Sequence, residues 1–423
     1  MNHPRLAAIA RAVALSLGLA WSLASAAGAA SPAELPSAGL ARAAIEQDPA
    51  VVQALRALEA SRHSAAMLEA GPHEWTVGAT AQRRRIDGGT NSSEWSMQIE
   101  RPIRIAGKAG LDRRLGQTTE DLARAQLAAA RVEVARTLLD TWIDWLAARQ
   151  ARESLDEQVR ASEENQRTVT LRQRAGDASR LELNVAQGDV AQARQQVATA
   201  ATAEAKALAA LKIRYPTLPA QPQPLPDPVA LEGDEAQWRA RVLDAHPLLK
   251  AAEQGLRKAE LTADRVRADR TPDPTVGVFT SSEASRTERV VGISLSIPLG
   301  GNYREQASRE ALKQVEVARA ALDRQRRELE LLVSGQVQDA IGSVERWRLA
   351  EQAAATARET ARLTQKAYTA GEADVQALLL VRRQALEAAT TANAARAEAL
   401  RARYRLQIDA GLLWPGSDRT TDR

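Results

Sequence analysis

The chain repeats its own pattern once, with a period of roughly two hundred residues, and this duplication limits the possible folds more than any single motif does. Asp48-Pro49 opens an Ala-rich amphipathic stretch, and His246-Pro247 opens a matching one. Further matches follow in the same order in both halves: Arg101-Pro102 with Ile297-Pro298, and Ala175-Gly176-Asp177 with Ala370-Gly371-Glu372. We therefore expect two copies of one structural unit.

Each half contains one region in which apolar and polar residues alternate with period two. Val291, Ile293 and Leu295 alternate with small residues, and a similar alternation runs over 95–100. Turn-rich loops separate these regions from preceding strands, which predicts two hairpins. The four strands are expected at about 75–86, 93–103, 275–281 and 289–299. Strands of this length cross a bilayer when tilted, although two soluble hairpins packed on helices would show the same pattern.

After each hairpin the spacing of apolar residues changes to threes and fours, which predicts long helices. These are expected at about 109–174 and 303–369, uninterrupted by proline, and return helices follow at about 179–213 and 374–410. A helix of some 65 residues would be about 100 Å long, a length typical of coiled coils. Leu379, Leu386, Asn393 and Leu400 are spaced by sevens on the last helix. The predicted fold is mainly α with a small β part, in which each repeat is a strand hairpin followed by a long antiparallel coiled-coil hairpin.

The ends and the middle of the chain set the domain boundaries. Basic residues, an apolar run from Ala12 to Ala24 and small residues after it are typical of a signal peptide. A membrane anchor is the alternative, but the run is shorter than the ~20 residues that span a bilayer. We expect a signal peptide at 1–30, a first repeat at 31–213, a Pro-rich linker at 214–232, a second repeat at 233–411 and a poorly ordered tail at 412–423.

Composition argues against several classes of protein. The chain has no cysteine, which excludes disulfides, thiolate metal sites and an acylated N-terminal cysteine. Its four histidines form no HExxH motif, and neither GxSxG nor GxxxxGK[ST] occurs. The 57 basic and 53 acidic residues are well mixed, which is typical of solvated helix faces. We expect no enzyme activity, no cofactor, no metal site and no nucleic-acid partner.

Four strands per chain leave two sheet edges without partners. Inside lipid, each unpaired backbone group costs several kcal/mol, because no water is present to bond it. A ring of identical chains would close the sheet, so membrane-crossing hairpins require an oligomer. A periplasmic coiled-coil scaffold or adaptor without a barrel is the alternative, and cell fractionation separates the two.

The duplicated halves, the strand segment from Val290 to Gly301 and the turn from Tyr368 to Asp374 together resemble the TolC-like outer membrane factor family over nearly the whole mature chain. The resemblance implies a homotrimer with a 12-stranded outer-membrane β-barrel that continues into a periplasmic α-helical barrel. Such ducts dock on a periplasmic adaptor (membrane fusion) protein and a proton-driven inner-membrane efflux pump, and they conduct substrate passively. The segment Ile99 to Lys108 is similar to the branch that serves heavy-metal cation pumps, but it could simply turn a strand into a helix at Gly107.

The resemblance also implies which residues form the periplasmic tip. Those expected at a constriction or adaptor-docking site are Gly176, Asp177, Glu182, Gly371, Glu372 and Asp374. Glu182 lies where family members carry an acidic ring, whereas the corresponding Ala377 and Leu380 are apolar. Ordinary turn and capping chemistry is the alternative. Outer membrane lipid is a further expected partner, and three arginines, Arg83 to Arg85, could meet lipid phosphates or simply keep a loop soluble.

Overall fold

The computed structural model describes residues 31–414 except 86, 90, 106 and 285–287, so the expected signal peptide lies outside the described residues. The chain divides into two compact units. We call one the hairpin unit; it comprises the described residues up to Ile45, Ala135–Leu231 and those from Asp339 on. We call the other the sheet unit; it comprises Glu46–Val134 and Glu232–Gln338.

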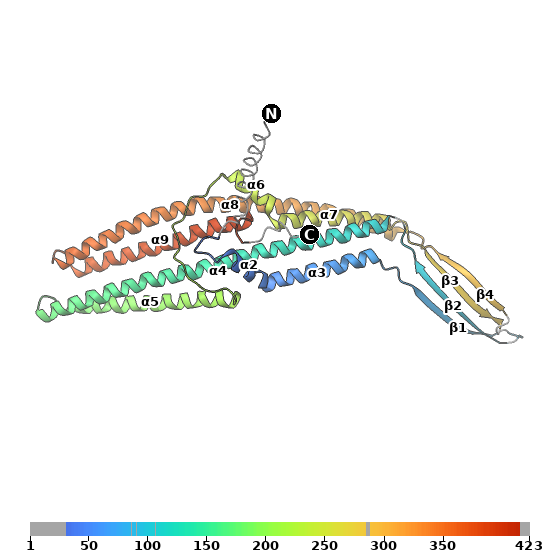
Figure 1. The fold of residues 1–423 in the computed structure, drawn as a ribbon, viewed down its shortest axis with the longest axis horizontal. Helices are drawn as coiled ribbons and strands as arrows, with labels where there is room; N and C mark the ends of the chain where they lie inside the picture. The colour runs from blue at the N-terminus through green and yellow to red at the C-terminus, as the bar shows by residue number, and fades with distance from the viewer. Residues whose placement is uncertain (1–30, 86, 90, 106, 285–287, 415–423) are drawn as a thin grey trace, which may run out of the picture. The chain divides into compact units, whose positions relative to one another are not determined.

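The sheet unit contains one antiparallel sheet with the strand order β1-β2-β3-β4 (Figure 1). The strands are β1 (Thr76–Arg84), β2 (Ser92–Pro102), β3 (Thr275–Glu283) and β4 (Glu288–Ser296). β2 and β3 come from different repeats and pair directly, with Ile99 opposite Val278. The two hairpins thus form one continuous sheet, whose edge strands are β1 and β4.

The register places most of the apolar residues of the four strands on one face. Val77, Ile99, Val278 and Ile293 lie opposite one another in a single row across the sheet. Their exposure is high, reaching 84% for Ile293, so the described parts of the chain leave this face uncovered. Apart from Phe279 and Val290, the opposite face carries mostly small and polar residues, including glycines. A Cβ at Gly292 would lie 2.5 Å from the ring of Phe279, so only glycine lets this ring lie across β4.

The strand predicted at 289–299 is shorter in the structure, where β4 ends at Ser296. Pro298 has no backbone N–H to donate to a strand ladder, and the segment after Ser296 is irregular up to Asn302, where α8 begins.

Two helices of equal length precede the two hairpins. They are α3 (Pro49–Ala70) and α7 (Pro247–Ala268), the latter preceded by the shorter α6 (Glu235–Ala245). Asp48 caps α3 by accepting a 2.8 Å hydrogen bond from the amide of Ala50, and His246 caps α7 through Nδ1, 3.3 Å from the amide of Leu248. Proline follows each cap, because the first helical position needs no donor. The matching stretches seen in the sequence are therefore matching helices.

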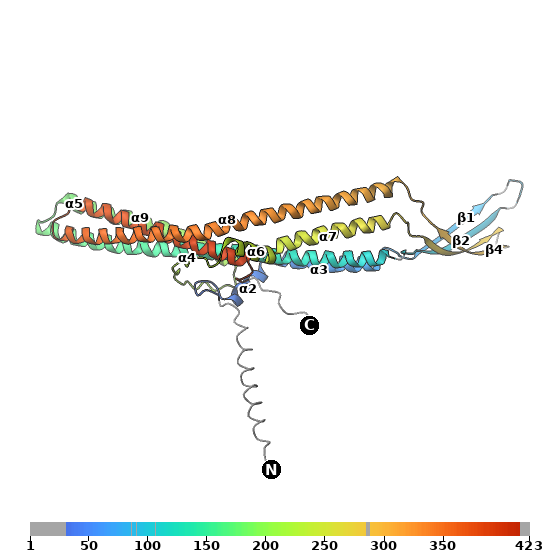
Figure 2. The same cartoon turned by 90° about the horizontal axis from the view of Figure 1, so that it is seen from above.

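The remaining length of each repeat is a helical hairpin (Figures 1 and 2). The long helices α4 (Lys108–Ala175) and α8 (Asn302–Thr369) have 68 residues each, and their return helices α5 (Arg180–Arg214) and α9 (Val375–Asp409) have 35 each. The predicted duplication of a strand hairpin plus a long helical hairpin is thus confirmed. Among the described residues, no helix is both long and apolar enough to cross a membrane.

The hairpin unit has its core where α4 passes the first and last described segments of the chain. Trp142 and Trp145 are 2% exposed and meet edge to face, 5.2 Å apart, and Trp142 Nε1 donates to the Glu34 carbonyl at 2.8 Å. The expectation of a poorly ordered tail needs correction at its start. Trp414 is 3% exposed and donates to the carbonyl of Pro36, because a large aromatic ring gains more from burial than the short tail loses in freedom. Residues 415–423 lie outside the described part.

Candidate functional site

The two helical hairpins of the hairpin unit each reverse at a glycine in the left-handed region. Gly176 has φ +87° and Gly371 has φ +77°, a conformation that residues with a Cβ rarely adopt. The amide that follows each glycine donates to the carbonyl five residues earlier, at 2.8 Å from Asp177 and 2.9 Å from Glu372. These are matching Schellman turns, in which the last carbonyls of a helix find donors. The predicted glycine turns therefore have the same geometry in both repeats.

The carboxylates expected at the tip are partly engaged as helix caps. Glu182 and Ser179 form a reciprocal capping box at the start of α5, with bonds of 3.0 and 3.1 Å. Asp374 accepts from the amide of Ala377 at 2.6 Å and caps α9. Asp177 and Glu372 lie exposed in the turns themselves. Capping thus accounts for one carboxylate oxygen of Glu182 and one of Asp374.

The two turns lie against one another, although they are far apart in the sequence. One apolar cluster joins residues of α4, α5, α8 and α9 beside the turns: Val169, Ala186, Tyr368, Val375 and Leu378. Ala178 and Ala373, which follow the two turn glycines, pack against the same cluster. The structure therefore brings the six predicted tip residues into one small region of the hairpin unit.

Tyr368 is a further candidate at the tip, although in the sequence it stood out only as the first residue of the turn from Tyr368 to Asp374. It is 3% exposed, and the guanidinium of Arg172 lies 5.6 Å from the centre of its ring. Burial raises the pKa of Tyr368, and the nearby Glu182 raises it further while Arg172 opposes both. Arg172 also donates to the carbonyl of Asp177 at 3.1 Å. A neutral phenol and a cation therefore connect α8 to the first turn.

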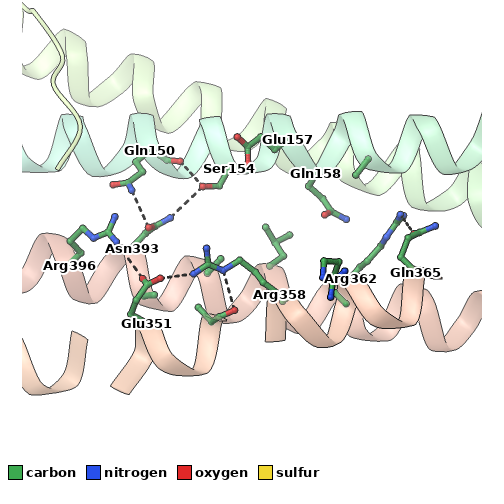
Figure 3. Close-up of a pocket in the computed structure, with 18 residues that line it drawn as sticks. Gln150, Ser154, Glu157, Gln158, Glu351, Arg358, Arg362, Gln365, Asn393 and Arg396 are labelled. Atoms are coloured by element: carbon green, nitrogen blue, oxygen red, sulfur yellow. Dashed lines mark hydrogen bonds and ion pairs between the residues drawn. The ribbon is translucent and has the colours of Figure 1, made fainter. Parts of the chain in front are cut away.

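Further along the hairpins, a groove of about 580 Å³ lies between α4, α8 and α9 (Figure 3). Asn393, the polar member of the row of sevens on α9, points toward α4. Its Oδ1 accepts from Gln150 Nε2 at 3.1 Å, and its Nδ2 lies 3.4 Å from Ser154 Oγ. A polar residue at a core position of a coiled coil fixes the register of its helices at some cost in stability. The spacing of Asn393 could have signalled this contact, but its partners on α4 could not be read from the sequence.

In the sheet unit, the segment that resembles the heavy-metal branch forms the passage from β2 to α4. Gly107 has φ +98°, and Lys108, whose side chain is 3% exposed, lies 3.0 Å from both Asp269 and Asp273. Asp273 also accepts from the amide of Ile105 at 3.0 Å. The buried lysine therefore joins the start of α4 to the segment that leads into β3. This contact agrees with the interpretation of the segment as a strand-to-helix junction.

Two arginines extend this ion network. Arg104 pairs with Asp112 at 3.0 Å and donates to carbonyls at the end of α3, including that of Glu69 at 2.6 Å. Arg265 of α7 binds both Asp112 and Asp269. Burial alone would raise the pKa of Asp269, but Arg265 and Lys108 outweigh it, so the pKa of Asp269 lies below its ordinary value. The network is structural, and among the described residues no group of three or more His, Cys, Asp or Glu could hold a metal ion.

Comparison with known proteins agrees with this architecture. The sequence pattern of the family described as "Outer membrane efflux protein" matches residues 40–213 and 238–411, which are the two repeats taken separately. Protein CyaE of Bordetella pertussis is 28% identical over 271 residues, which is 59% of this chain and 57% of that protein. The aligned region thus spans a little over half the length of this relative.

Two solved structures illustrate the likeness of fold. The outer membrane protein VceC of Vibrio cholerae matches with a TM-score of 0.69 at 14% identity, covering 89% of this chain and 96% of that one. The open state of the MtrE outer membrane channel of Neisseria gonorrhoeae matches with a TM-score of 0.66 at 19% identity, covering 89% of each chain. At these identities the likeness concerns the fold alone.

Proposed function

The chain belongs to the outer membrane efflux protein family, and from this membership we propose that it is one subunit of a passive export duct in the outer membrane. Channels of this family are not enzymes, and they form trimers in tripartite efflux systems. In this proposal an inner-membrane pump delivers substrate through a periplasmic adaptor protein to the hairpin unit. Substrate then leaves through the barrel without chemistry of the channel's own.

The observation that carries the proposal is the open sheet with its uncovered apolar face. β1 and β4 are edge strands, and they run antiparallel to each other because three antiparallel pairings separate them. In lipid both edges need partners, so β4 of one subunit pairs with β1 of the next and continues the antiparallel sheet. With three copies of a 4-stranded sheet, the barrel has about 12 strands, within the range of outer-membrane barrels.

Cysteine crosslinking tests this pairing directly, because the chain has no cysteine of its own. Ala79→Cys in the middle of β1 is combined with single cysteines at successive positions of β4, from Val291 to Leu295. Oxidation of intact cells should give crosslinked dimers and trimers at one register. Met97→Cys on β2 is the matched control, because β1 and β3 already flank that strand. No crosslink at any β4 position would refute barrel closure by these edges.

Cell fractionation separates the duct from a periplasmic scaffold. Native protein crosslinked in separated outer-membrane fractions should run as a trimer on an unboiled gel. A soluble monomer or dimer would refute the duct and favour the scaffold. This experiment does not depend on the transported substrate, so its result is valid for any cargo.

We further propose that the paired glycine turns form the periplasmic tip, where the duct narrows and the adaptor docks. Support comes from the packing of both turns in one cluster and from the exposure of Asp177 and Glu372. Glu182→Gln tests the charge alone, since glutamine can preserve the capping box. The proposal expects lower cation selectivity and an altered single-channel conductance. The control is Glu316→Gln on the exposed surface of α8, which should change neither. Unchanged selectivity in Glu182→Gln would remove this residue from the constriction.

For the cargo, we propose heavy-metal cations driven by a proton-coupled pump, on the similarity of the segment from Ile99 to Lys108. Arg104 and Lys108 of this segment serve the junction between β2 and α4, so the support for this cargo lies in sequence alone. A strain lacking the protein should tolerate less zinc, cobalt, cadmium or copper. Unchanged tolerance to all four metals would exclude this cargo and leave the duct in place.

A further inference from the structure

A groove of about 660 Å³ lies at one end of the apolar face of the sheet, where the strands meet the helices of the sheet unit. Its walls are mostly apolar, and its polar rim carries arginine. The larger apolar side chains that line it are those of Trp75, Ile99, Ile103, Val276 and Val278. Arg101 and Arg104 line the same groove. The groove is therefore amphipathic, with its apolar wall continuous with the face that carries Ile293 and Leu295.

Arg101 is a charged residue among apolar neighbours on this face. It lies opposite Val276, in a row that ends at Leu295 of β4, and the neighbouring row is wholly apolar. In the described part of the chain no carboxylate lies within ion-pair distance of Arg101. Its Nε donates to the carbonyl of His73 at 2.8 Å, and its guanidinium lies 5.4 Å from the ring centre of Trp75. The side chain is thus held in place while its two terminal nitrogens remain available.

An unpaired guanidinium at the edge of a lipid-facing surface lies at the depth of the headgroups, where an anionic lipid group can pair with it. Arginine stems lie along apolar surface while the charged end reaches the interface. Trp75, which is 62% exposed beside Arg101, belongs to a residue type that concentrates at the same depth. Arg104 contributes less, because Asp112 already pairs with it. One cation, an aromatic ring and an apolar wall therefore coincide.

We propose that this groove binds a phospholipid of the periplasmic leaflet, with the phosphate on Arg101 and the first part of an acyl chain along Ile99, Val276 and Val278. The inference rests on the proposed function, because it takes the sheet as embedded in the outer membrane with its helical end toward the periplasm. A free phosphate would make no contact with the apolar wall, and an uncharged lipid would not pair with Arg101. One lipid per subunit would seat the barrel at a fixed depth.

Native mass spectrometry of the full-length protein in a non-ionic detergent tests the proposal. The probes are palmitoyl-oleoyl phosphatidylglycerol and the diacylglycerol with the same chains, which lacks the phosphate. The wild type should bind phosphatidylglycerol, saturating at one per subunit, and bind diacylglycerol roughly fivefold more weakly, the loss expected for one basic contact to a lipid headgroup. Arg101→Gln should lower phosphatidylglycerol affinity by about the same factor and leave diacylglycerol binding unchanged. Arg101→Lys should restore most of the affinity.

The matched control is Arg289→Gln, which removes an arginine from the same face at the opposite end of the strands. Equal affinity of the wild type for both probes would overturn the proposal without any variant. So would equal phosphatidylglycerol affinity in Arg101→Gln and Arg289→Gln, or displacement of the lipid by millimolar inorganic phosphate. If these results came from trimers recovered from the outer membrane, the lipid site would fail and the duct would stand. If no variant and no wild type reached the outer membrane, the duct itself would fail.

Discussion

Replacing Lys108 with methionine should open the junction between β2, α4 and β3. Its ammonium lies 2.8 Å from the carbonyl of Thr271 and 3.0 Å from both Asp269 and Asp273. Methionine fills a similar volume but leaves those carboxylates without their lysine. Asp269 is 40% exposed and keeps Arg265, so most of the loss arises at Asp273, whose side chain is 19% exposed. Breaking a buried pair costs about 3–5 kcal/mol, and we expect the lower end of this range.

The effect should depend on pH in a definite direction. Burial alone would raise the pKa of Asp273, but the amide of Ile105 and the ammonium of Lys108 outweigh it, so the folded pKa lies below the unfolded one. A lowered carboxylate pKa contributes stability that is present above the unfolded value of about 3.9 and is lost as the pH falls through the folded value. Lys108→Met should therefore cost most near pH 7, and its cost should shrink below about pH 4.

Hydrogen exchange measures this loss locally, without requiring reversible unfolding of the whole assembly. The amide of Ile105 donates to Asp273, so a peptide that contains it reports the junction directly. A loss of about 3 kcal/mol corresponds to roughly a hundredfold faster exchange at pH 7. Lys313→Met is the matched control, because this exposed lysine on α8 pairs with Glu316 one turn away and its loss should change exchange little. Equal exchange in the two variants would refute a stabilising role for the buried ion network.

Two further predictions concern the helical hairpins. Gly176→Ala should speed hydrogen exchange at the first turn by about tenfold, because a Cβ at φ +87° costs roughly 1–2 kcal/mol. Gly188→Ala is the control: a Cβ there meets open space on α5, so this change should slow hydrogen exchange slightly. Similar effects of the two changes would contradict the assignment of a left-handed glycine turn at Gly176. Asn393→Leu should raise the thermal midpoint but lower the yield of a bismaleimide crosslink between cysteines replacing Asp144 and Arg401, whose side chains meet across α4 and α9. An unchanged yield would show that Asn393 does not fix the register.

The sequence predicted those features that depend on local pattern. The start of a helical stretch at Asp48-Pro49, the period-two strands and the glycine at the end of α4 each depend on residues within a few positions. The capping role of Glu182 was foreseen as an alternative, because its partner Ser179 is three residues away. The contacts of Lys108 could not be predicted in this way, since its partners lie 163 and 165 residues along the chain. These partners come close to Lys108 through contacts between the two repeats, among them the pairing of β2 with β3 and the Arg265–Asp112 ion pair.

The ion network around Lys108 makes the strand-to-helix junction of the first repeat different from that of the second. After β2, the chain enters its long helix with Lys108, which binds carboxylates in the segment before β3. After β4, it enters the second long helix with Asn302, a neutral residue whose Oδ1 accepts from Gln306 of its own helix. The β2–β3 seam within a subunit therefore carries a buried ion pair that position 302 cannot supply at the proposed seam between β4 and the next subunit. Because the Lys108 ion pair stabilises the β2–β3 pairing, we expect a closed barrel to open first between subunits. Mild denaturation should then release monomers whose 4-stranded sheets are still paired.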